Sequence, residues 1–83
     1  MNRRRQKTLE ALFVDPPSGT IAWASIEALL RAVGCETVEG RGSRVRFVKD
    51  GLVEAFHRPH PAKARKYQVR AARDYLTRLG VKP

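Results

Sequence analysis

A hairpin signature in the middle of the chain constrains the fold more than any other feature. Ser43 to Val48 alternates apolar and basic side chains, with Val45 and Phe47 on one face and arginines on the other. This period of two is typical of a half-buried strand. Lys49-Asp50-Gly51 is a turn sequence, and Leu52 to His57 supplies the second strand. The pattern therefore predicts an antiparallel hairpin with one apolar face and one basic face.

Two registers are open for this hairpin, and they place His57 on different faces. A two-residue turn at Asp50-Gly51 places Arg44 opposite His57. A three-residue turn that includes Lys49 places Ser43 opposite His57 instead, and it gives the better match of apolar faces. Because directly opposite side chains share a face, the second register would put His57 on the apolar side of the sheet.

The segments around the hairpin predict three helices and one more strand. In the second helix the apolar residues Ile26, Leu29, Leu30 and Val33 recur at helical spacing. The predicted helices cover Arg4–Phe13, Trp23–Val33 and Lys66–Leu79, and the additional strand covers Cys35–Glu39. The order α-α-β-β-β-α predicts an α+β fold, in which a three-stranded antiparallel sheet has helices on one face and leaves its other face open.

The charge of the chain is concentrated in its second half. The formal net charge is +9, from 17 Lys and Arg against 8 Asp and Glu, and residues 1–40 are neutral with five of each sign. Arg outnumbers Lys by 12 to 5, and a guanidinium binds phosphate in bidentate fashion and stacks on bases better than an ammonium does. The basic half therefore favours a polyanion or an acidic protein surface as partner, and the alternative is a solvated face that only aids solubility.

Several function classes are excluded by what the sequence lacks. The 83 residues allow a single domain over 1–83, and no P-loop, HExxH or nucleophile-elbow motif is present. The apolar runs are shorter than the ~20 residues of a membrane span, and no secretory signal follows the basic start. The lone Cys35 forms no internal disulfide, which predicts a cytoplasmic location. We expect no membrane contact, no cofactor and no metal site.

The two histidines point to a possible reaction. Cleavage of RNA through its 2′-hydroxyl needs one group that takes a proton and cations that hold the phosphate. His57, at the end of a strand, is the candidate catalytic base, with Arg44 or Arg46 beside it on the neighbouring strand. The alternative is that His57 only ends the strand and that His60 is a surface loop residue.

Further phosphate contacts are expected around this histidine. The turn before Ser43 can present backbone amides to a phosphate, and basic residues precede the last helix, whose N-terminus attracts anions. The candidate RNA-binding residues are Ser43, Arg44, Arg46, Arg58, His60, Lys63 and Lys66.

Taken in order, several short segments resemble the HicA family. They are Ile26–Gly34, Gly42-Ser43 with Val45 and Phe47, His60-Pro61, and a final amphipathic helix that ends at Leu79-Gly80-Val81. The resemblance spans residues 20–82. It implies that residues 1–19 form an additional N-terminal helix and loop on a HicA-like core.

The resemblance also implies a function. HicA proteins are small toxins with a fold like that of double-stranded-RNA-binding domains, and they cleave mRNA without a metal and slow growth. It implies an acidic HicB-type antitoxin that blocks the active site and joins the toxin in repressing the shared operon. Operator DNA would then be contacted only through the antitoxin complex.

One position departs from the family pattern. The catalytic histidine of the family follows the Gly-Ser pair, and Arg44 occupies that place in this chain. We therefore expect His57 to act as the base while Arg44 binds the phosphate. Two competing hypotheses are an RNA-binding module without catalysis and an adaptor whose basic face binds an acidic protein.

Overall fold

The computed structural model describes residues 1–83 as three helices and three strands. The elements are α1 (Arg3–Leu12), α2 (Trp23–Ala32), β1 (Glu36–Glu39), β2 (Arg44–Lys49), β3 (Leu52–His57) and α3 (Lys66–Arg78). The predicted order of elements is confirmed, and each element ends within one residue of its predicted bounds. None of the three helices has the length and apolar character needed to cross a lipid bilayer.

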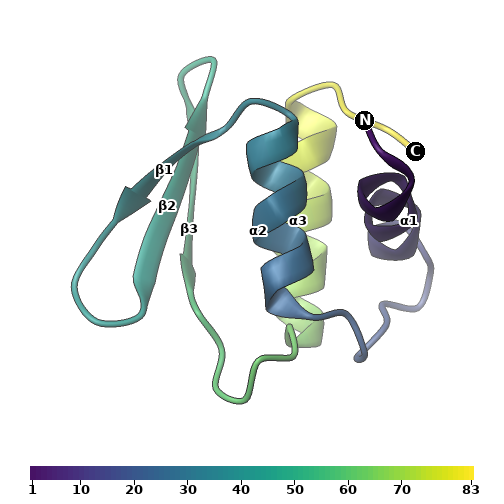
Figure 1. Ribbon diagram of the computed structural model, residues 1–83, viewed down its shortest axis with the longest axis horizontal. Coiled ribbons are helices and arrows are strands. Elements are labelled where there is room, and N and C mark those ends of the chain that lie inside the picture. The colour runs from purple at the N-terminus through teal and green to yellow at the C-terminus, as the bar shows by residue number, and fades with distance from the viewer.

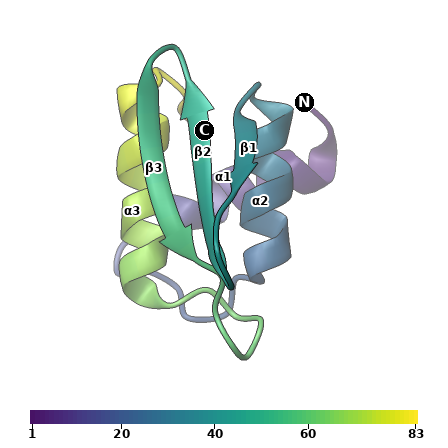
Figure 2. The ribbon, with the colours of Figure 1, turned by 90° about the vertical axis from the view of Figure 1, so that its left-hand side faces the viewer.

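The elements stack in layers, with the sheet on one side (Figure 1). The strands pair antiparallel in the order β1-β2-β3, and α2 and α3 pack against one face of this sheet. Helix α1 packs against α2 and α3 on the side away from the sheet. The other face of the sheet carries no helix, as Figure 2 shows from that side. The predicted one-sided arrangement is therefore confirmed.

A single apolar core joins the layers. Sixteen buried apolar residues form one cluster, which reaches from Val45 and Phe47 of β2 to Leu9 and Leu12 of α1. The buried hydroxyl of Tyr75 lies 3.1 Å from the carbonyl oxygen of Phe47 and 3.0 Å from that of Leu52. This contact holds α3 against the hairpin, because the phenol ring fills the core while its hydroxyl reaches backbone acceptors.

The hairpin uses the two-residue turn, so the register favoured by face matching is wrong. Lys49 pairs with Leu52 and Arg44 pairs with His57. Asp50 and Gly51 have φ values of 53° and 76°, and two successive positive values are typical of the type I′ turn, whose twist suits a hairpin. The apolar faces also match in this register, because Val45 lies opposite Phe56 and both are buried.

Candidate functional site

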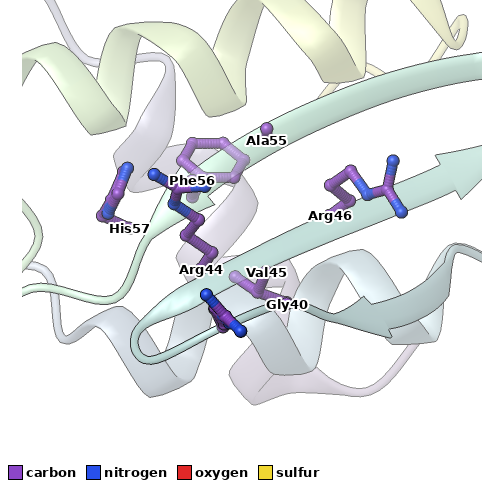
Figure 3. A pocket seen from close by; sticks show the side chains of 8 residues that line it. Gly40, Arg44, Val45, Arg46, Ala55, Phe56 and His57 are labelled. Atoms are coloured by element: carbon purple, nitrogen blue, oxygen red, sulfur yellow. The ribbon is translucent and has the colours of Figure 1, made fainter.

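The open face of the sheet is hollowed at the end where β2 begins and β3 ends. A depression of about 570 Å³ lies there (Figure 3). Its lining residues are Gly40, Arg41, Arg44, Val45, Arg46, Ala55, Phe56 and His57. The residues come from the β1–β2 turn and from two neighbouring strands, so the hairpin register sets which side chains meet in it.

Alternation along the two strands brings basic side chains to this face. Arg44, Arg46 and His57 are exposed, whereas Val45 and Phe56 between them are buried beneath the sheet. Figure 3 shows the Arg44 side chain extending from β2 toward His57, while Arg46 extends in the other direction. His57 therefore shares a face with the arginines, in contrast to the apolar face that the wrong register gave it.

The arginines of the depression have no carboxylate partners. None of Arg41, Arg44 and Arg46 forms an ion pair, although five ion pairs are present elsewhere in the protein. An unpaired guanidinium keeps its donors free for a phosphate, which it can bind through two parallel hydrogen bonds. The imidazole opposite Arg44 supplies a group that can accept a proton. The arrangement can thus hold a phosphodiester beside the imidazole of His57, which can act as a general base.

The backbone at His57 is fixed by hydrogen bonds from two other elements. Gln68, in the first turn of α3 and only 2% exposed, donates from Nε2 to the carbonyl oxygen of His57 at 2.7 Å. The amide oxygen of Gln68 accepts from the backbone N–H of Arg65 at 2.9 Å. The backbone N–H of Arg58 donates to the carbonyl oxygen of Ser43 at 2.8 Å. The position of His57 therefore depends on α3 and on the start of β2.

The next residue, Arg58, is held by two carboxylates. Its Nε donates to Glu27 of α2 at 2.7 Å, and its Nη1 and Nη2 donate to Glu39 of β1 at 2.6 and 2.8 Å. Glu27 also accepts from the Trp23 indole and from Arg31. Although Arg58 was a candidate RNA-binding residue, the structure places it in this ion-pair cluster, and it does not line the depression.

The cluster stays charged near neutral pH. Burial alone would raise the pKa of Glu27, but hydrogen bonds from Arg58 and Trp23, with the charges of Arg58 and Arg31, bring that pKa below its ordinary value. Hydrogen bonds from Arg58 lower the pKa of Glu39 as well. The two carboxylates in turn raise the pKa of the Arg58 guanidinium. Arg58 is thus neutralised within the protein, whereas Arg44 is not.

Sequence reasoning overlooked Glu27 and Gln68. For Glu27 a signal was available, because it lies one turn from Trp23 within the apolar stripe of its helix, and a carboxylate there needs a buried partner. Gln68 had no comparable signal, since its role depends on a contact with the end of a distant strand.

The remaining candidates lie apart from the depression. Lys63 and Lys66 line a separate hollow of about 440 Å³ beside Gly19 and Tyr67, at the start of α3. His60 is exposed in the loop between β3 and α3, and Ser43 is exposed in the turn before β2. No three His, Cys, Asp or Glu side chains lie close enough together to share a metal ion.

The part of the chain that contains the sheet and its open face matches a known protein family. A family model described as HicA toxin of bacterial toxin-antitoxin matches residues 23–81, from α2 through α3, and leaves α1 outside the match. No curated protein and no solved structure matches the chain.

Proposed function

The chain belongs to the HicA toxin family of bacterial toxin–antitoxin systems, and from this premise we propose that it is an endoribonuclease that cleaves mRNA without a metal ion. Its cleavage of mRNA would stop translation and growth. One observation carries the proposal: exposed His57 lies directly opposite Arg44, on a face whose arginines have no carboxylate partners. The membership implies a cognate antitoxin as partner.

The proposed reaction uses the 2′-hydroxyl of the RNA as nucleophile. Arg44 binds the non-bridging oxygens of the scissile phosphate, and His57 takes the proton from the neighbouring 2′-hydroxyl. The 2′-oxygen attacks phosphorus, the bond from phosphorus to the 5′-oxygen breaks, and the departing oxygen takes a proton from solvent. The products are a 2′,3′-cyclic phosphate and a 5′-hydroxyl. Arg44 and Arg46 stabilise the negative charge that grows on the phosphate oxygens.

Arg44 makes this an altered version of the family site. The resemblance places the family histidine where Arg44 stands, so the base has to come from another residue. Support for His57 comes from the antiparallel register, because it puts the imidazole opposite Arg44. The buried Gln68 holds the backbone of His57, which supports a defined position for the base.

The antitoxin in this proposal is an acidic HicB-type protein that covers Arg44, Arg46 and His57. The hairpin half of the same face carries valines, among them Val53 with 48% exposure. Apolar side chains beside unpaired cations suit a protein partner with an apolar centre and an acidic rim. Contact with operator DNA would occur through the antitoxin complex. A complex in which the antitoxin leaves this face open would contradict the proposal.

A second candidate function is an RNA-binding module without catalysis on the same fold. It is favoured by the presence of Arg44 at the position of the family's catalytic histidine, because an arginine there binds phosphate but does not act as a general base. Such a protein would bind RNA with strong salt dependence but leave it intact.

A cleavage assay in the presence of EDTA separates the two candidates. We expect the purified protein to cut mRNA under these conditions, and we expect His57→Ala to bind the same RNA without cutting it. His60→Ala is the matched control, because it removes an exposed imidazole outside the depression. Binding without cleavage by the wild type would favour the second candidate, and cleavage by His57→Ala at the wild-type rate would exclude His57 as the base.

A further inference from the structure

Helix α1 carries a second group of cations that the proposed reaction does not use. Arg3, Arg4, Arg5 and Lys7 occupy its first two turns, and none of them forms an ion pair. No acidic residue lies in the first turn. Cations at a helix N-terminus oppose the helix dipole, so this placement weakens the helix. No side chain of the protein balances these charges, so all four cations are available to an anion.

One of these arginines has a donor without a partner. The Nε of Arg5 is the single buried side-chain nitrogen or oxygen in the protein that has no hydrogen-bond partner. Arg5 lines a hollow of about 270 Å³ between α1 and the start of α2. The hollow is lined by Asn2, Arg4, Arg5, Thr8, Ala24, Ser25 and Ala28, and holds no carboxylate. The guanidinium of Arg5 therefore has neither an ion pair nor an internal acceptor for its Nε, so its charge is not balanced within the chain.

This surface is separate from the candidate catalytic face. Helices α2 and α3 lie between α1 and the sheet, so the two basic surfaces are on opposite sides of the molecule (Figure 1). Helix α1 also lies outside the segment that matches the toxin family. Its cations are therefore additional to the HicA-like part of the chain.

We propose that α1 is a second phosphate-binding surface, which holds the substrate RNA away from the point of cleavage. The proposal rests on the proposed function for the identity of the ligand as RNA. The exposed side chains within α1 are all charged, namely Arg3, Arg4, Lys7 and Glu10. The exposed apolar residues Met1 and Val14 lie beyond the two ends of the helix, so its exposed face has no apolar centre of the kind that protein interfaces use. A nucleic-acid backbone, in contrast, is held by cations. The open sheet face, with its exposed Val53, differs in this respect.

The test measures RNA binding as a function of salt concentration. The probe is a long oligonucleotide with methylated 2′-hydroxyls, which the proposed reaction leaves intact, and its fluorescence anisotropy is followed. The α1 variant combines Arg3→Gln, Arg4→Gln and Lys7→Gln, and it retains Arg5 and the packing of the helix. With three cations lost, we expect the slope of log K against log salt to fall by about 2, and affinity at physiological salt to fall by about ten- to fiftyfold.

Two controls separate this effect from changes in folding and in net charge. Arg3→Lys with Arg4→Lys preserves the charge and should preserve the slope. Lys49→Gln with Lys82→Gln removes exposed or half-buried cations outside both surfaces, and should change the slope by less per charge. Because the α1 variant relieves repulsion with the helix dipole, its melting temperature should not fall.

The outcomes distinguish the two proposals. If the α1 variant binds the long RNA with the wild-type slope while Arg44→Gln abolishes cleavage, the inference about α1 is wrong and the proposed function stands. If the wild type neither binds nor cuts RNA, the proposed function is wrong, and the inference about α1 is wrong with it because it takes RNA as the ligand. If the α1 variant loses affinity for the antitoxin and keeps its RNA affinity, α1 is a protein interface and the inference is overturned. When the α1 variant cleaves a long RNA substrate, we expect its KM to be higher than that of the wild type and its kcat to be unchanged.

Discussion

Arg44 and Arg58 lie at the same end of the sheet and face different surroundings. Arg44 is on the open face with no carboxylate partner, whereas Arg58 is held by Glu27 and Glu39. An arginine whose charge is balanced within the chain ties elements together, and one left unbalanced is available to a ligand. The same distinction separates the unpaired cations of α1 from Arg58. The net charge of +9 therefore includes arginines of two kinds, those paired within the protein and those available to a ligand.

The largest expected effect is on the base that faces Arg44. His57→Ala should lower the single-turnover rate of RNA cleavage by roughly 10²- to 10⁴-fold, because proton transfer to a positioned side chain contributes that much. RNA affinity should change little, since the phosphate contacts remain. A rate constant within twofold of the wild type would remove His57 from the proposed site.

The comparison of the two arginines is tested by the same substitution at each. Arg44→Gln should lower cleavage by roughly 10²- to 10³-fold, because it removes a charged donor from the phosphate, and leave the melting temperature unchanged. Arg58→Gln should lower the free energy of unfolding by about 2 kcal/mol, and the melting temperature by roughly 10 °C, because the carboxylate of Glu27 loses the closer of its two charged donors and keeps only Arg31. Equal melting temperatures for both variants would show that the ion pairs of Arg58 contribute nothing to stability.

Gln68 of α3 holds the backbone of the proposed base, His57. Gln68→Leu removes the hydrogen bond to the carbonyl oxygen of His57, so the imidazole should lose its defined position. We expect kcat to fall by roughly tenfold with KM unchanged, in a protein that is still folded at the assay temperature. Thr77→Ala, an exposed change in the same helix, is the control. A change in KM alone would mean that Gln68 affects RNA binding and not the base.

The smallest expected effect is the pH dependence of the cluster. The pKa of Glu27 is below its ordinary value of 4.5 in the folded protein, so the unfolded state binds more protons in the acid range. The free energy of unfolding should therefore rise with pH there. This contribution is complete above pH 4.5 and is lost as pH falls through the folded pKa. Glu27→Gln should reduce the slope, measured by denaturant unfolding at several acid pH values. An unchanged slope would contradict the assignment.

Local patterns in the sequence predicted the elements and the distribution of charge. The alternation over β2 and the helical spacing in α2 repeat at the period of the backbone itself, so they can be recognised without knowledge of the fold. The Asp50-Gly51 turn was also visible, but face matching favoured the wrong register because it left out the pairing of Val45 with Phe56. That single residue of register decided whether His57 was buried or exposed.

The sequence by itself determined the three helices, the meander, the basic second half and the resemblance to HicA toxins. Only the tertiary structure decided which cations remain unpaired. Arg58 meets its carboxylates across 31 and 19 residues of chain, and Gln68 meets His57 across 11. The tertiary structure also set α1 on the side away from the sheet. The physical reason is that periodicity is a local property of the backbone, whereas charge balance depends on contacts between distant segments.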